Sequence, residues 1–385
     1  MTLNTVAPSD DTQQPTLRAE AVAAASRFAP RARELRQHVI DHHEIHPELW
    51  SELCDRGWPG LLRSDGLAGM SLVLEAFAEQ GILLWLPVLS SAVAHAIDKQ
   101  GPDPARRWLE GVSAGTTLLG VAMTEPETGH NVFATRTQIR RDGDTFVVNG
   151  FKQVTSGLDI VDRVLVHGRA VGQDGTSSGY ATVLVDPRAA GATATEVPMG
   201  NREGLRQFGL ELRDVVVPAA DLVGDVGSGM LVLWSFANVE RVLTASICLG
   251  AARHCIEAAV DRARTRTIAG GLPIGTKQAI SHPIARLHAR YSAARSLLLD
   301  ITAAFDAGDD GASFASNVNA VKVLASELAF DAADHTVQVF GAEAWDRRGP
   351  WMDLYLDARL SRSGPLSNEF ALNFLAEHVL GLPAN

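Results

Sequence analysis

The sequence predicts an α+β protein with three successive regions, helical, β and helical, and three observations support this. The chain has 385 residues, which is too long for one ordinary core, so two or three domains are expected. Helical periodicity fills residues 1–115 and 225–385, whereas residues 116–224 alternate with period two and contain β-branched runs. This order favours separate domains over a single wound sheet.

Residues 1–115 have the residue spacing of a helical region. Pro47 begins one helix, since proline is favoured in the first helical turn, and Gly57 ends it. The stretch 81–97 is strongly apolar, yet it contains a proline, two serines and a histidine and is too short to span a bilayer. We therefore expect it to be a buried helix. Helices are expected over residues 17–39, 47–57, 70–80 and 83–99.

The β-region is predicted over residues 116–224. A short apolar strand leads into the turn Thr124-Glu125-Pro126, with Gly129 close behind. The run Asp142-Gly143-Asp144 predicts the tip of a hairpin, and the following strand is predicted to end at Asn149-Gly150, another favoured turn pair. Further strands are expected over residues 163–167, 180–185 and 212–217.

Helical periodicity returns from Gly229 onward. Breaks between helices are expected at residues 269–274 and 307–312. Cys248 and Cys255 lie at helical spacing in the first of these helices, and we expect them in its apolar core.

Composition argues against several functional classes. The net charge of -11 disfavours nucleic-acid binding, because a surface that neutralises phosphates needs clustered Lys and Arg. The three cysteines form no Cys-x-x-Cys motif and no disulfide framework, which predicts a cytoplasmic protein. Residues 1–15 hold no apolar signal segment, and no membrane partner is expected. Four histidines match no zinc-site spacing, so no metal site is predicted: His38, His42, His43 and His46.

The order of several motifs resembles that of the acyl-CoA dehydrogenase family, over roughly residues 45–382. The resemblance implies an N-terminal helical domain (1–115), a middle β-barrel or sandwich domain (116–224) and a C-terminal four-helix bundle (225–385). The motifs that carry it are Met123-Thr124-Glu125-Pro126 with Gly129, Asn149-Gly150-Phe151-Lys152, Arg266 with Pro273-Ile274 and Gln278, Gln338-Val339-Phe340-Gly341, and the run 354–359.

The resemblance further implies FAD, bound between the β-domain and the bundle. One set of residues is expected near the flavin within the same subunit: Val121, Met123, Thr124, Gly129, His130, Thr155 and Ser367. A second set is expected to reach the pyrophosphate and adenosine of a neighbouring subunit's FAD: Arg266, Gln338 and Gly341. An arginine suits that task because its planar fork binds phosphate through two hydrogen bonds. The resemblance therefore also implies a homodimer or homotetramer.

The residue expected to act as the base departs from the common pattern. The position of the usual glutamate, counted from the run 354–359, falls on Pro365, which has neither a carboxylate nor a backbone N–H for the thioester oxygen. A slip of one residue would place Gly364 there and restore the donor. Some family members carry the glutamate on an earlier helix, and there this chain has Glu240.

Glu240 is therefore the predicted catalytic base, with Asn238 and Arg241 beside the pantetheine arm of the substrate. The alternative interpretation is structural. Glu240 would lie in the first turn of a helix, stabilised by the helix dipole, and Asn238 would be the N-cap residue.

The leading functional hypothesis is FAD-dependent oxidation of an acyl thioester to the enoyl thioester. The acyl carrier is CoA or an acyl carrier protein, the latter typical of secondary metabolism, and the electron acceptor is a flavoprotein or oxygen. Two alternatives stay open: a flavoenzyme of the same fold with oxygen-dependent or non-α,β chemistry, and a non-catalytic subunit that binds flavin or an acyl group.

Overall fold

The computed structural model describes residues 14–129, 131–200, 205–268, 270–309 and 311–383. Helices fill the N-terminal region, as predicted. The stretch 17–39 contains two helices, because the 3-10 turn Ala29–Arg31 with Pro30 at its centre interrupts the α-helical hydrogen bonds. The α-helices of the N-terminal region are α1 (Gln14–Phe28), α2 (Ala32–His42), α3 (Pro47–Asp55), α4 (Leu61–Ser64), α5 (Gly66–Ala78), α6 (Trp85–Gln100) and α7 (Trp108–Ser113).

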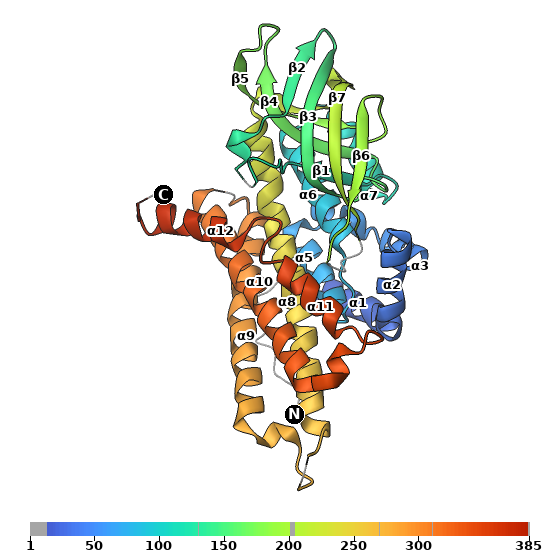
Figure 1. Ribbon diagram of the computed structural model, residues 1–385, viewed down its shortest axis with the longest axis vertical. Helices are drawn as coiled ribbons and strands as arrows, with labels where there is room; N and C mark the ends of the chain where they lie inside the picture. The colour runs from blue at the N-terminus through green and yellow to red at the C-terminus, as the bar shows by residue number, and fades with distance from the viewer. Residues whose placement is uncertain (1–13, 130, 201–204, 269, 310, 384–385) are drawn as a thin grey trace.

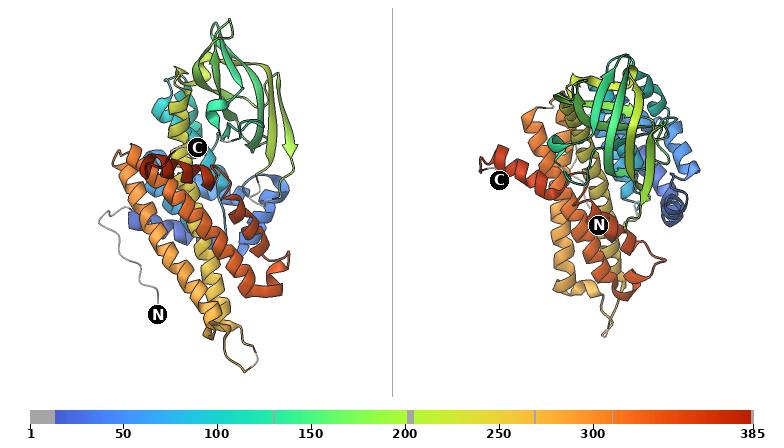
Figure 2. Two further views of the ribbon diagram at one scale, coloured as in Figure 1. Left: turned by 60° about the vertical axis from the view of Figure 1, so that its left-hand side comes forward. Right: turned by 45° about the horizontal axis from the view of Figure 1, so that its top comes forward.

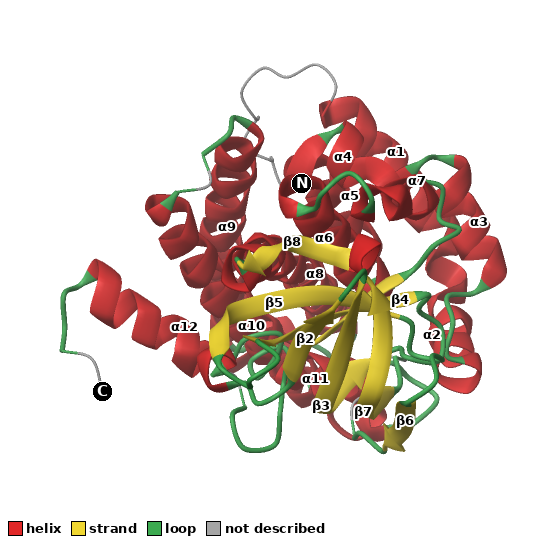
Figure 3. Cartoon of the chain, turned by 90° about the horizontal axis from the view of Figure 1, so that it is seen from above, coloured by secondary structure: helices red, strands yellow, loops and turns green. Residues whose placement is uncertain are grey.

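Within the described residues, eight strands form one mixed sheet at one end of the molecule (Figure 1). Its order is β6-β7-β3-β2-β4-β5-β8, and β1 and β2 both pair with β4 in parallel, at different points along it. Seen from that end, α3 and α7 lie to one side of the strands and α9 and α12 to the other (Figure 3). The strands are β1 (Leu119–Ala122), β2 (Gln138–Asp142), β3 (Thr145–Ser156), β4 (Arg163–Val171), β5 (Ser177–Val185), β6 (Ala192–Val197), β7 (Gln207–Pro218) and β8 (Leu222–Gly227).

The hairpin predicted at Asp142-Gly143-Asp144 is confirmed, since β2 and β3 pair across it with Asp142 opposite Thr145. The turn predicted at Asn149-Gly150 is wrong. There β3 continues without a turn, and β7 bulges opposite it: Val148 pairs with Val215 and Gly150 with Leu212, so residues 213–214 of β7 face Asn149 alone.

The single residue opposite the bulge, Asn149, is hydrogen-bonded to a residue of the bulge, Asp214. The Asn149 amide accepts from the backbone N–H of Asp214 at 2.8 Å and donates to its carboxylate at 2.9 Å. A Cβ on Gly150 would lie 2.4 Å from the Thr137 hydroxyl, so the close approach of β3 to the residue that precedes β2 requires glycine.

The C-terminal region is a bundle of long helices that begins directly after β8. Its elements are α8 (Gly229–Thr265), α9 (Gln278–Asp306), α10 (Ala312–Phe340), α11 (Trp351–Leu360) and α12 (Asn368–Phe374). The first of these runs from the sheet to the far end of the molecule, and α9 and α10 run beside it (Figures 1 and 2). The breaks predicted at 269–274 and 307–312 separate α8, α9 and α10.

Two apolar helices form much of the helical core. The helix predicted within 81–97 is α6, and most of its side chains are buried. By length and composition, α8 is long and apolar enough to cross a membrane, but 67% of its most apolar window is buried inside the protein. That burial is the pattern of a central bundle helix. Cys248 and Cys255 lie in this core, as predicted.

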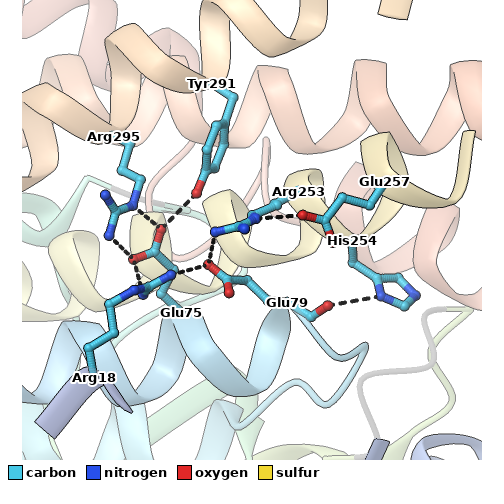
Figure 4. A network of polar contacts seen from close by, with 8 residues as sticks. All are labelled: Arg18, Glu75, Glu79, Arg253, His254, Glu257, Tyr291 and Arg295. Carbon is cyan, nitrogen blue, oxygen red and sulfur yellow. Dashed lines mark hydrogen bonds and ion pairs between the residues drawn. The ribbon is translucent and has the colours of Figure 1, made fainter. Parts of the chain in front are cut away.

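A network of buried ion pairs joins the N-terminal helices to the bundle (Figure 4). Glu75 of α5 accepts from Arg295 of α9 at 2.6 Å. Glu79, just beyond α5, pairs with Arg18 of α1 at 2.8 Å and with Arg253 of α8 at 3.1 Å. Both carboxylates are therefore held by arginines, which suits groups that position helices rather than groups that exchange protons.

Candidate active site

The two motifs of the β-domain meet in a buried ion pair. The ammonium group of Lys152 donates to the Glu125 carboxylate at 2.8 Å and to the carbonyl of Met123 at 3.1 Å. The same carboxylate also accepts from the hydroxyls of Thr135 and Thr137. Burial opposes ionisation of Glu125, but these hydrogen bonds outweigh it and lower its pKa to about 2.

This pair places segments 121–124 and 152–155 side by side. The backbone N–H of Gln153 donates to the carbonyl of Thr124 at 2.8 Å. Val121 and Met123 are half-buried and pack against the helical core, so this edge of the sheet faces the helices. Thr155 is 1% exposed, and among the described residues its hydroxyl has no hydrogen-bond partner. The structure thus brings together four of the residues predicted to lie at the flavin.

The other residues predicted near the same flavin are placed differently. Gly129 closes the turn after Glu125, to whose carbonyl its N–H donates at 3.0 Å, and it has a positive φ of 53°. His130 lies outside the described residues. Ser367 is half-buried and serves as the N-cap of α12, where its hydroxyl accepts from the N–H of Phe370.

Arg266, Gln338 and Gly341 lie far from the β-domain residues of their own chain. Arg266 follows the end of α8, and Gln338 and Gly341 lie at the end of α10. Both helix ends are at the opposite end of the bundle from the sheet (Figure 1). All three residues are exposed in the single chain.

Glu240 lies within α8 and is 6% exposed. The structural alternative for it is wrong: α8 begins at Gly229, so Glu240 is well inside the helix and Asn238 is not its cap. Burial raises the pKa of Glu240 to about 8, although the positive charges of Arg241 and Lys322 act against this.

Among the buried carboxylates of the described residues, Glu240 alone has no ion pair, and no hydrogen bond to it is found there. All the others are held by a cation: Glu75, Glu79, Glu125, Asp221 and Asp357. A carboxylate that is buried, unpaired and raised in pKa has the properties of a general base.

Two polar residues of α8 close to Glu240 in sequence, Asn238 and Arg241, contact each other across one helical turn. Arg241 donates to the side-chain oxygen of Asn238, one turn earlier, at 3.3 Å. Its Nε atom is buried and has no partner within the described part of the chain. Burial lowers the pKa of Arg241, while the charge of Glu240 opposes that change.

The segment between α11 and α12 holds Pro365 at the position of the family's usual base. The N–H of Gly364 donates to the carbonyl of Leu360 at 3.0 Å. The alternative in which Gly364 supplies a free donor to the thioester oxygen is therefore not supported, because that N–H already has a partner.

A buried lysine that was not predicted from the sequence contacts this segment. Lys322 of α10 is 0% exposed, and its ammonium group donates to the carbonyl of Leu366 and to the side-chain oxygen of Asn368 at 2.7 Å. The available signal was a single charge inside the apolar run Val321-Lys322-Val323-Leu324.

Comparison with known families identifies the chain. The family model "Acyl-CoA dehydrogenase, middle domain" matches residues 120–215, and "Acyl-CoA dehydrogenase, C-terminal domain" matches residues 227–380. Together the two matches cover more than half of the protein. The chain belongs to the acyl-CoA dehydrogenase family.

Individual relatives agree with this assignment. The acyl-CoA dehydrogenase FadE12 of Mycobacterium tuberculosis is 35% identical over 351 residues, which cover 89% of this chain and 90% of that protein. A solved glutaryl-coenzyme A dehydrogenase in complex with glutaryl-CoA is 21% identical, with a TM-score of 0.89 and 98% of each chain covered. The prolyl acyl carrier protein oxidase AnaB has the same fold, with a TM-score of 0.85 at 17% identity over 96% of this chain and 100% of that one.

The protein is accordingly an oxidoreductase that dehydrogenates acyl thioesters, with FAD as its cofactor. The residues present fit this cofactor. The unpartnered Thr155 hydroxyl, buried beside residues 121–124, is a polar atom of the kind that a ring system with hydrogen-bonding edges would satisfy. No group of three or more His, Cys, Asp or Glu side chains suited to a metal ion occurs in the described ranges.

Proposed function

We propose that Glu240 is the base that removes the α-proton of an acyl thioester. The observation that carries the proposal is its state: it is the one buried carboxylate without an ion pair among the described residues. A base with a pKa near the working pH is the most effective proton acceptor for such a step. Pro365 offers no carboxylate, and the nearby Glu369 is exposed.

The proposed step removes one proton and one hydride from the substrate. The Glu240 carboxylate takes the α-proton, and the electrons of that C–H bond form the α,β double bond as a hydride leaves the β-carbon. FAD, held beside Thr155, would supply the acceptor for that hydride. Two buried donors without a partner in the described chain, Arg241 Nε and Asn368 Nδ2, are available to oxygen atoms of the substrate.

The thioester carrier is proposed to be CoA. The relative that is 35% identical over nearly the whole chain is an acyl-CoA dehydrogenase, whereas the acyl carrier protein oxidase resembles this chain at 17% identity and supports the fold only. One acyl group presented on CoA and on a carrier protein distinguishes the two. Faster flavin bleaching by the carrier-protein thioester would reverse this choice.

The FAD site is proposed to be completed by a second subunit. Arg266, Gln338 and Gly341 carry the resemblance to residues that hold the pyrophosphate and adenosine, yet they lie at the end of the bundle opposite the sheet (Figure 1). One chain alone does not bring them to its own Thr155. Pairing of two chains in a closed dimer joins the two halves of the site.

The decisive experiment compares Glu240→Gln with the wild type by anaerobic stopped-flow spectroscopy of flavin bleaching. The variant keeps the size of the side chain but cannot accept the proton, so it should bind FAD and substrate and reduce flavin about a hundred- to ten-thousand-fold more slowly. Glu369→Gln is the matched control, and it should bleach at the wild-type rate.

Adding Pro365→Glu to the Glu240→Gln variant should restore little activity. In the family the usual glutamate lies in a Tyr-Glu-Gly sequence, and Gly364 and Leu366 do not reproduce it. If Glu240→Gln bleaches as fast as the wild type with a native substrate, the base lies elsewhere. The oxygen-dependent or non-α,β alternative would then take precedence.

A further inference from the structure

Lys322 of α10 is hydrogen-bonded to the segment that leads into α12. Its ammonium group donates to the Leu366 carbonyl and to Asn368 Oδ1, and Ser326, one turn further along α10, donates to the same Asn368 oxygen at 3.0 Å. Asn368 is 2% exposed and Lys322 is fully buried.

The same lysine belongs to the surroundings of Glu240. Helices α8 and α10 pack against each other and carry Glu240 and Lys322 respectively. Two positive charges act on the Glu240 carboxylate, Arg241 from its own helix and Lys322 from the facing one. The titratable groups that act on Lys322 come from two helices: Glu240, Arg241 and Cys248 of α8, and Glu369 of α12.

A buried lysine needs a reason, because burying an ammonium group is costly unless its charge is compensated. Burial lowers the pKa of Lys322 to about 8, which means that burial disfavours the charged ammonium form of this lysine. Both hydrogen-bond acceptors of Lys322 are neutral oxygens. Apolar residues in its place would be less costly, so its charge is best explained by an effect on a neighbour.

We propose that Lys322 is a positioning residue of the active site: it anchors residues 366–368 to α10, and its positive charge acts on Glu240 across the packed helices α8 and α10 and favours the ionised carboxylate. The inference rests on the proposed role of Glu240. It assigns two tasks to one side chain, of which the first is mechanical and the second electrostatic, and each has its own measurement.

The electrostatic task is measured on the carboxyl group itself. Infrared difference titration of the FAD-loaded protein follows the carbonyl stretch of protonated Glu240, identified as the band that Glu240→Gln removes. In Lys322→Met, which keeps the length of the side chain but not the charge, the midpoint of this band should rise by about one pH unit. Ser326→Ala is the matched control, since it removes a hydrogen bond to the same Asn368 oxygen without changing charge, and its midpoint should not move.

Asn368→Asp is a second variant for the case in which Lys322→Met does not fold. It keeps the volume of the side chain and the oxygen that accepts from Lys322 and Ser326, and it adds a negative charge that offsets the lysine. The midpoint of Glu240 should again rise. An unmoved midpoint in a folded Lys322→Met, or in Asn368→Asp where the former does not fold, overturns the electrostatic assignment.

The mechanical task is measured by amide hydrogen exchange. Exchange over residues 366–368 should become faster in Lys322→Met than in the wild type, and unchanged exchange there overturns the anchoring role. Flavin bleaching is recorded on the same variants. If Glu240→Gln bleaches normally while the infrared midpoints shift as expected, the base assignment fails and the Lys322–Glu240 coupling stands. The reverse pattern rejects the coupling alone.

Discussion

Lys152 and Glu125 form an ion pair at 2.8 Å in which neither side chain is more than 2% exposed. The two residues belong to different motifs, Met-Thr-Glu-Pro and Asn-Gly-x-Lys, so the pair explains why the motifs occur together. By donating also to the Met123 carbonyl, Lys152 fixes the strand end that packs against the helical core. The pair therefore positions the residues around Thr155 without contributing to the chemistry itself.

Removing either partner of this pair should strongly destabilise the protein. Lys152→Met leaves a buried carboxylate without its cation, and Glu125→Gln leaves a buried ammonium group, each at a cost of about 3–5 kcal/mol in the free energy of unfolding. Denaturant unfolding measures the loss. The double variant Lys152→Met/Glu125→Gln should lose clearly less than the sum of the two single losses, because no unpaired charge is left. Strictly additive losses would show that the two groups do not depend on each other.

The raised pKa of Glu240 predicts a pH-dependent reductive step. Only the carboxylate accepts a proton, so at limiting substrate the rate of flavin reduction should rise about tenfold per pH unit below the pKa and level off above about 8. Anaerobic stopped-flow measurements across this range give the profile. A flat profile between slightly acidic and alkaline pH would show that a group of pKa near 8 does not control the step.

The same residue predicts a dependence of stability on pH. The pKa of Glu240 is raised on folding from 4.5 to about 8, so its favourable contribution to stability is complete below pH 4.5 and is lost as the pH rises through 8. Glu240→Gln cannot ionise and should gain stability relative to the wild type over that window. Thermal or denaturant unfolding of both proteins across the window measures the difference. A constant difference would mean that the Glu240 carboxyl is not desolvated.

Much of the fold was predictable, because it depends on local patterns. Period-two alternation predicted most of the strands, and the Asp142-Gly143-Asp144 turn predicted the β2–β3 hairpin. The Asn149-Gly150 pair was misinterpreted because its partner, Asp214, lies 65 residues further along the chain. The same two residue types can form a tight turn or continue a strand opposite a bulge, and only the neighbouring strand decides between them.

The site divides in the same way. Glu240 is buried and has no ion pair within the described residues, and the proposed base rests on this. Its burial depends on the packing of α8 against α10 and could not be derived from its own neighbours in sequence. Lys322 was missed because its acceptors lie 44 and 46 residues later, at Leu366 and Asn368. Charged residues inside apolar runs are the signal to look for, since they are buried only where a distant segment compensates them.

Subunit mixing tests whether the flavin site is shared. In a mixed dimer of Glu240→Gln and Arg266→Ala chains, one site receives Glu240 from the Arg266→Ala chain and Arg266 from the other chain, and is therefore intact. The second site carries both defects. Each variant alone should be nearly inactive, the first in proton abstraction and the second in holding the pyrophosphate through the arginine fork. After co-refolding of equal amounts, about a quarter of all sites should be active, since half of the dimers are mixed and one of their two sites is whole.

Glu240→Gln mixed with Gln338→Ala should complement in the same way, whereas Arg266→Ala mixed with Gln338→Ala should complement less well, because each site of that mixed dimer lacks one of the two contacts. Activity of the first mixture no higher than that of the separate variants would place Arg266 outside the partner's flavin site.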